Sequence, residues 1–124
     1  MPHSLKSWAQ HAPLLILTAA QVTRANAEGK QAPNASALHD AGLANMSIAI
    51  EATHRGLMIH MMGGFHRDAA RNLLNAIEPG LEPVTVMSVG HAGAIVDLPE
   101  ELQKRELAPR TRKTLDEIVL KPAV

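Results

Sequence analysis

The sequence predicts an α/β (α+β) fold, with helices flanking a sheet. Two segments, residues 14–20 and 83–90, are short, mostly apolar and bounded by turn-forming residues, which is typical of buried strands. Between them, residues 36–55 carry small and apolar residues at helical spacing and end before Gly56, a residue type that often closes a helix in the left-handed conformation. Strands and helices that alternate along one chain indicate a mixed domain of this class.

The N-terminal part of the chain is predicted to lead into the first strand. Leu5 and Trp8 lie three residues apart in a polar stretch, which indicates the end of a helix or an irregular arm. Pro13 then favours extended backbone beside it, so the apolar run at 14–20 is expected to be a buried strand. Residues 24–35 contain Asn, Gly and Pro and are expected to form an exposed loop.

The central segment gives the clearest helical pattern. Ser36 is expected to cap its start, and Asp40 to lie near the positive end of the helix dipole. The predicted buried face consists of residues at helical spacing: Ala41, Asn45, Ile48, Ala49 and Ala52. Small residues at Ala41, Gly42 and Ala44 leave room for another backbone to approach this helix closely.

Further elements and a tail follow this helix. Residues 57–62 are expected to be extended and residues 66–77 to form a second helix, with a pair of glycines between them and Pro79-Gly80 after them. In the tail, Pro99 is placed to open a short helix. A basic stretch and a last apolar segment then follow: Lys104, Arg105, Arg110, Arg112 and Lys113, and then Leu115, Ile118, Val119 and Leu120.

Composition limits the classes of function open to the chain. Its 124 residues argue for a single domain, residues 1–124, and its 12 basic and 12 acidic residues balance, so no net charge attracts nucleic acid or an anionic membrane. The absence of cysteine excludes disulfides and thiolate chemistry. The longest apolar run, residues 12–20, is too short to span a bilayer, and the start lacks the apolar core of a signal peptide. A cytoplasmic protein without nucleic-acid or membrane partners is therefore predicted.

The sequence offers no constellation of side chains for acid–base catalysis or metal binding. Among the seven histidines, His54, His60 and His66 are six residues apart, which places them on no common helical face, so no metal site is predicted. No serine stands in a nucleophile elbow, and residues 90–93 lack the Lys and Ser/Thr of a phosphate loop. No catalytic side chain is assigned.

Three blocks of the chain resemble the nitroreductase family in order and spacing. The first is residues 8–13 with the strand that follows. The second block comprises Asp40-Ala41-Gly42-Leu43-Ala44, Ala52, Gly56-Leu57 and Gly63-Gly64-Phe65. The third block comprises residues 83–91, Leu98-Pro99 and residues 110–119. The resemblance extends over about residues 6–120, and the order of the blocks carries it more than any one of them does.

The resemblance implies a flavin site with two parts and no other cofactor. The family's glycine loop corresponds here to Met62, Gly63 and Gly64, whose backbone N–H groups would hydrogen-bond N5 and O4 of FMN. The basic pair that relatives place on the flavin phosphate corresponds to Arg110 and Arg112, with Lys113 as a substitute.

The resemblance also implies an activity and an assembly. Nitroreductases are flavin-dependent oxidoreductases that pass reducing equivalents from NAD(P)H through FMN to nitroaromatic or quinone-like acceptors, and the flavin carries the chemistry. Members of the family are usually homodimers, and the small-residue face of the helix at 36–55 is expected to contribute to that interface.

An N-terminally incomplete domain is expected, because the helices and the Arg-rich motif with which relatives hold the flavin have no counterpart ahead of Trp8. On this view the chain is a fragment, a half that pairs with another polypeptide, or a minimal relative. The alternative function is a non-enzymatic remnant or oligomeric binding module that lacks a complete flavin site.

Overall fold

The computed structural model describes residues 9–120, and these fall into two compact units divided between Ala92 and Gly93. Leu5 and Trp8, for which a helix end or an arm was predicted, lie outside the described residues. Within that described part, the first unit holds all the strands and the helices α2 and α3, and the second holds short helices. The mixed composition of helices and open sheets confirms the predicted fold class.

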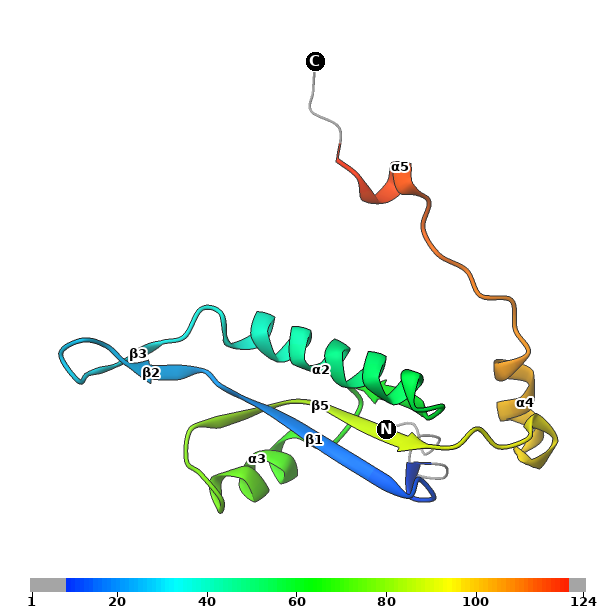
Figure 1. The fold of residues 1–124 in the computed structure, drawn as a ribbon, viewed down its shortest axis with the longest axis horizontal. Helices are drawn as coiled ribbons and strands as arrows, with labels where there is room; N and C mark the ends of the chain where they lie inside the picture. The colour runs from blue at the N-terminus through cyan, green and yellow to red at the C-terminus, as the bar shows by residue number, and fades with distance from the viewer. Residues whose placement is uncertain (1–8, 121–124) are drawn as a thin grey trace. The chain divides into compact units, whose positions relative to one another are not determined.

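The main sheet of the first unit has three antiparallel strands in the order β1-β5-β4. The strands are β1 (Leu14–Gln21), β5 (Leu81–Gly90) and β4 (Met58–Met62). Figure 1 shows β1 (blue) beside β5 (yellow-green), with α2 above this pair and α3 below it in the view. The two strands predicted at 14–20 and 83–90 are thus neighbours, and the extended segment predicted at 57–62 is β4.

A β-bulge interrupts the pairing of β1 with β5. Thr18 lies opposite Thr85 but Ala19 lies opposite Pro83, so Val84 is the extra residue on β5. Proline has no N–H to donate to a ladder, and within a sheet it is tolerated at such a bulge. On its other side, β5 pairs with β4 only as far as Val86, so residues 81–85 extend past the end of β4.

Burial is concentrated in the central strand and is lower in β1 than predicted. Met87 is fully buried, and Ser88 and Val89 are nearly so. In β1, Ala20 is buried, whereas Leu14 and Leu15 are about half exposed at 51% and 49%. The prediction of a continuously buried strand at 14–20 was therefore wrong at its start, because β1 is an edge strand of this sheet.

The exposed loop predicted at 24–35 contains a short hairpin instead. It consists of β2 (Thr23–Ala25) and β3 (Gln31–Pro33), which pair antiparallel. The Asn26 side-chain oxygen accepts the N–H groups of Glu28 at 3.1 Å and Lys30 at 2.8 Å, and Gly29 has a φ of 76°. This side-chain cap on the turn brings the two strands together.

The predicted central helix is α2 (Ala37–His54), and Gly56 after it has a φ of 72°, as expected for a left-handed helix end. The capping role predicted for Ser36 was wrong. Ser36 is the N-cap residue, but its helical backbone (φ −86°, ψ −10°) leaves its hydroxyl without a cap bond, whereas capping side chains require extended backbone at this position.

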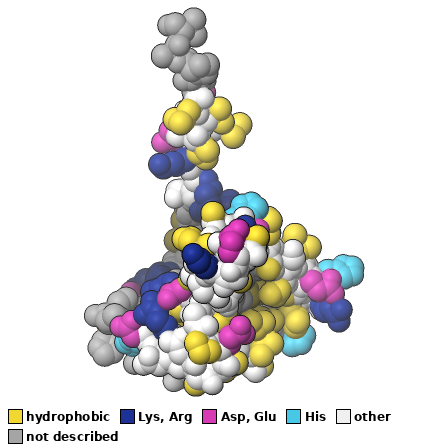
Figure 2. Space-filling view, turned by 90° about the vertical axis from the view of Figure 1, so that its left-hand side faces the viewer, with side chains coloured by type: hydrophobic (Ala, Val, Ile, Leu, Met, Phe, Trp, Pro, Cys, Tyr) yellow, Lys and Arg dark blue, Asp and Glu magenta, His cyan; other side chains and the backbone are white. Residues whose placement is uncertain are grey.

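The faces of α2 differ from the prediction in detail. Asn45, Ala49 and Ala52 are buried as predicted, and so is Ala37, but Ala41 is only half-buried and Ile48 is 36% exposed. Large apolar side chains on the other faces of α2 are exposed, namely Leu38, Leu43, Met46 and Ile50. Figure 2 shows that hydrophobic side chains gather at the surface of the molecule. Large apolar side chains that are exposed on a helix in this number often mark a surface that further protein covers.

The second helix of the first unit, α3 (Arg67–Asn75), is shorter than the predicted 66–77. His66 is its N-cap residue, and Leu74 is its buried apolar anchor. Leu73 and Ile77 are 59% and 76% exposed. The helix ends before the turn at Gly80, whose φ is 86°.

The second unit contains the 3₁₀ helix η1 (Ile95–Asp97), α4 (Glu100–Glu106) and α5 (Leu115–Ile118). Pro99 precedes α4 as predicted. At the start of α5, the Glu117 carboxylate accepts the Thr114 backbone N–H at 2.8 Å and the Thr114 hydroxyl at 2.9 Å. The backbone bond is one half of the capping box of α5, and both bonds lower the pKa of Glu117.

Candidate functional site

The predicted glycine loop joins the end of β4 to the start of α3. Met62 ends β4 and is buried at 7% exposure, whereas Gly63 and Gly64 after it are exposed. A Cβ atom built on Gly63 would have no atom within 4 Å. The loop therefore leaves open backbone directly beside a buried apolar residue, a combination that suits the approach of a planar, partly apolar ligand.

The two glycines of this loop do not adopt left-handed backbone. Among the described residues, positive φ occurs at Gly29, Gly56 and Gly80, and neither Gly63 nor Gly64 is among them. What these two glycines contribute is the absence of a side chain, not access to left-handed backbone.

Two hydrogen bonds attach the flanks of this loop to β5, and an ion pair attaches α3 to the same strand one turn further along. The Thr85 hydroxyl donates to the Met62 carbonyl at 2.8 Å, at the end of β4. Arg67, the first residue of α3, donates from Nη2 to the Pro83 carbonyl. Arg71, one turn further along, donates from Nε to the Glu82 carboxylate at 2.9 Å and from Nη2 at 3.1 Å.

The Arg71–Glu82 ion pair is bidentate, which is a strong geometry for an arginine–carboxylate contact. Its guanidinium also contacts Asp68 at 2.8 Å. The hydrogen bond from Arg71 lowers the pKa of Glu82, and the bond to Glu82 raises the pKa of Arg71. Both side chains remain about one-third exposed, so screening by solvent limits the contribution of the pair to stability.

Sequence reasoning did not single out Thr85 or Arg67. A threonine in a β-strand and an arginine at the start of a helix are both common, so neither residue carries a signal by itself. Their contacts depend on the length of β4 relative to β5, which only the register shows.

The predicted phosphate ligands belong to the second unit. Arg110, Arg112 and Lys113 lie in the extended segment between α4 and α5 and are exposed. Arg112 donates to the neighbouring Thr111 carbonyl at 2.7 Å. Within residues 9–120, none of these three cations has a carboxylate partner. The two predicted parts of the site therefore belong to different units: the glycine loop, Met62 to Gly64, to the first, and the three cations to the second.

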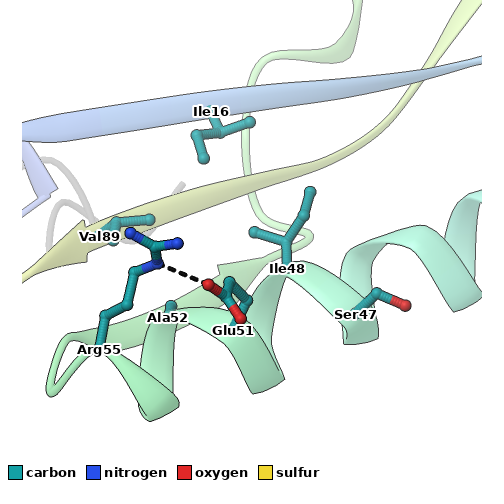
Figure 3. A pocket seen from close by; sticks show the side chains of 7 residues that line it. All are labelled: Ile16, Ser47, Ile48, Glu51, Ala52, Arg55 and Val89. Carbon is teal, nitrogen blue, oxygen red and sulfur yellow. Dashed lines mark hydrogen bonds and ion pairs between the residues drawn. The ribbon is translucent and has the colours of Figure 1, made fainter.

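A shallow open groove of about 430 Å³ lies between α2 and the sheet. Ile16 of β1 and Val89 of β5 form one wall, and Ile48 points toward them from α2, as Figure 3 shows. Near the end of α2, Arg55 Nε donates to Glu51 at 2.6 Å (dashed in Figure 3). Apart from Ser47 and this ion pair the lining side chains are apolar, which makes the groove a weak candidate for a small-molecule site.

The described residues contain no cluster of three or more His, Cys, Asp or Glu side chains that could hold a metal ion. In the same part of the chain, no helix has the length and apolar character needed to cross a membrane.

The comparisons with known proteins decide the family. The model of the nitroreductase family matches residues 1–91. The chain belongs to the nitroreductase family. A relative from Mycolicibacterium smegmatis, the "uncharacterized 15.4 kDa protein in ask 5′ region", is 34% identical over 113 residues, which make up 90% of this chain and 71% of that protein.

Two solved structures resemble this nitroreductase-family chain. An oxidoreductase containing FMN superposes with a TM-score of 0.86 at 27% identity, over 99% of this chain and 61% of that one. A nitroreductase family protein from Clostridium difficile 630 gives a TM-score of 0.61 at 26% identity, over 91% of this chain and 61% of that one. The present chain thus spans about three-fifths of the length of these two relatives.

Proposed function

We propose that this nitroreductase-family chain is an FMN-dependent oxidoreductase that passes reducing equivalents from NAD(P)H to a nitroaromatic or quinone-like acceptor. The observation that carries the proposal is the similarity of nearly the whole chain to an oxidoreductase containing FMN, with a TM-score of 0.86. When bound, the flavin supplies the redox chemistry, and the protein supplies binding and orientation.

In this proposal, the backbone of Met62, Gly63 and Gly64 binds the flavin ring. Three features support the assignment: the loop is exposed, the side of Gly63 that a Cβ would occupy is open, and the preceding carbonyl of Met62 is already bonded to Thr85. The residues present therefore fit an aromatic ring that approaches from the open side of the loop. Since the contacts come from the main chain, no acid–base side chain is required there.

Arg110 and Arg112 are proposed to bind the flavin phosphate, with Lys113 as a third cation. The absence of carboxylate partners for these cations within the described residues supports this role. The planar guanidinium group can donate two parallel hydrogen bonds to phosphate oxygens, which lysine cannot do.

We further propose that the protein works as a homodimer in the cytoplasm. The exposed apolar side chains of α2 support the dimer, since Leu38, Leu43, Met46 and Ile50 are each more than half exposed in the single chain. The exposed Gly42 has no atom within 4 Å of its Cβ position, so a second backbone could approach α2 there.

The first test is the visible absorption spectrum of the purified protein after incubation with FMN and desalting. A retained flavin band, followed by bleaching on addition of NADH or NADPH under anaerobic conditions, is the expected result. If no flavin is retained, and titration with excess FMN gives no quenching of flavin fluorescence, the oxidoreductase proposal is refuted. The alternative of a non-enzymatic binding module would then be preferred.

A further inference from the structure

The loop between β4 and α3 is short and is fixed at both of its ends. Residues 63–66 separate Met62, the last residue of β4, from Arg67, the first residue of α3. Met62 is bonded through its carbonyl to Thr85, and Arg67 is bonded to the carbonyl of Pro83. Both partners lie in residues 81–85, the part of β5 that extends past the end of β4.

Thr85 connects all three strands of the sheet at this point. Its hydroxyl donates to the Met62 carbonyl of β4 at 2.8 Å, and its own carbonyl accepts the Thr18 hydroxyl of β1 at 3.2 Å. The ladder between β4 and β5 stops at the pair Met62–Val86, so the threonine hydroxyl continues the cross-strand bonding by one more step. This bond fixes the carbonyl that immediately precedes Gly63.

Arg67 fixes the other end of the loop by two contacts. Its guanidinium donates to the carbonyl of Pro83, a fully buried residue next to the bulge of β5. The same guanidinium lies over the ring of Phe65, 5.5 Å from its centroid, at a distance typical of a cation–π contact. One side chain therefore attaches the last part of the loop to the sheet and packs against the residue that follows Gly64.

We infer that Thr85 and Arg67 are positioning residues that hold the Gly63–Gly64 backbone in the arrangement that binds the flavin ring. This inference rests on the proposed function. The contacts of Thr85 and Arg67 do not reach the open side of the loop, so they affect flavin binding only by ordering the backbone that binds it. A pair of adjacent glycines is the most flexible dipeptide available, so its ordering must come from its neighbours. A loop that is ordered before binding costs less free energy to bind than one that is ordered by the ligand.

The test compares two variants with two matched controls. Thr85→Val removes the hydroxyl and keeps the branched shape, and Arg67→Gln removes the guanidinium. Thr18→Val deletes a similar hydroxyl-to-backbone bond between β1 and β5, and Arg71→Gln deletes the neighbouring arginine of α3, whose partner is Glu82. The measurements are the Kd for FMN from quenching of flavin fluorescence and, on the FMN-free protein, hydrogen–deuterium exchange of the peptide that covers residues 62–66.

The expected result is a Kd for FMN about five- to tenfold higher in Thr85→Val and in Arg67→Gln, the size of one lost hydrogen bond. Both should exchange faster at residues 62–66 without flavin, and Arg67→Lys, which keeps a donor and the charge, should recover part of the affinity. Thr18→Val and Arg71→Gln should lower the melting temperature while their Kd stays within about twofold of the wild type.

Three outcomes would overturn the inference. Unchanged affinity in both variants, while the wild type binds FMN, refutes the positioning role and leaves the proposed function intact. An equal loss of affinity in the two controls shows that the effect is general destabilisation. A wild type that binds no FMN refutes the proposed function, and the inference with it. If Thr85→Val fails to fold, the comparison of Arg67→Gln and Arg67→Lys with Arg71→Gln decides the matter.

Discussion

Substitution of Gly63 by valine separates the proposed binding role of the glycine loop from a structural one. Gly63 lies outside the left-handed region, so a side chain causes no backbone strain, and its Cβ would meet no atom within 4 Å. The free energy of unfolding of Gly63→Val should therefore lie within about 0.5 kcal/mol of the wild type, as for an ordinary exposed site.

Binding of FMN should respond strongly to the same substitution. A flavin ring bound by the backbone at this loop would occupy the space that the valine side chain fills. Crowding of this kind costs about 1–3 kcal/mol in packed protein sites. At about 1.4 kcal/mol per factor of ten, the Kd for FMN should rise roughly 5- to 150-fold.

The assay combines urea unfolding of the flavin-free protein with a fluorescence titration of FMN. Gly56→Val is a matched control, because Gly56 is equally open but has a φ of 72°. There, valine should destabilise the fold by about 1–2 kcal/mol and leave the Kd of the folded protein unchanged. Wild-type affinity in Gly63→Val would refute the assignment of this loop to the flavin, and a loss of 2 kcal/mol or more in its stability would refute the description of Gly63 as an open site.

Three further predictions concern the phosphate ligands, the ion pair on α3 and the core. Arg112→Ala should raise the Kd for FMN about tenfold or more and flatten its salt dependence, while Arg105→Ala on α4 should change neither; equal losses would contradict a specific phosphate contact. Because Arg71 lowers the pKa of Glu82 below its ordinary value, the stabilisation from this carboxylate is present at neutral pH and is lost as the pH falls through the lowered pKa. Urea unfolding of Glu82→Gln should therefore show a deficit near pH 7 that disappears in acid, and a deficit that persists in acid would contradict this. Met87→Ala should cost about 2–5 kcal/mol of unfolding free energy, since Met87 is fully buried in the central strand, and a loss below about 1 kcal/mol would place the core elsewhere.

The elements with strong local signals could be predicted from the sequence. The helix at α2 was predictable because its spacing and Gly56 agree, and β5 because its residues are apolar and partly β-branched. Features that depend on pairing could not be predicted. The exposure of Leu14 and Leu15 follows from the edge position of β1, and the hairpin β2–β3 follows from a turn organised by the side chain of Asn26.

Only the main-chain part of the candidate site could be named from the sequence, and its role in binding stays a prediction. A pair of glycines after an extended segment can be recognised in a sequence, so Gly63 and Gly64 could be named. Which side chains order them could not be foreseen, because Thr85 and Arg67 reach the loop only through the register of β4 against β5. The role of the cations at 110–113 remains a prediction that rests on the family resemblance and on their lack of carboxylate partners within the described residues.

The difference in length between β4 and β5 connects the fold of the first unit to its proposed function. Because β4 stops at Met62 while β5 begins five residues before the partner of Met62, carbonyl groups of β5 are left without a strand on that side. Arg67 bonds the carbonyl of Pro83 in this part of β5, and Thr85 bonds back to the last carbonyl of β4. A longer β4 would pair with residues 81–85 by an ordinary ladder, but it would draw Gly63 and Gly64 into the sheet and close the open backbone beside Met62. The early end of β4 therefore keeps the backbone of the proposed binding loop open, and in our inference the two side chains supply the order that the ladder no longer provides.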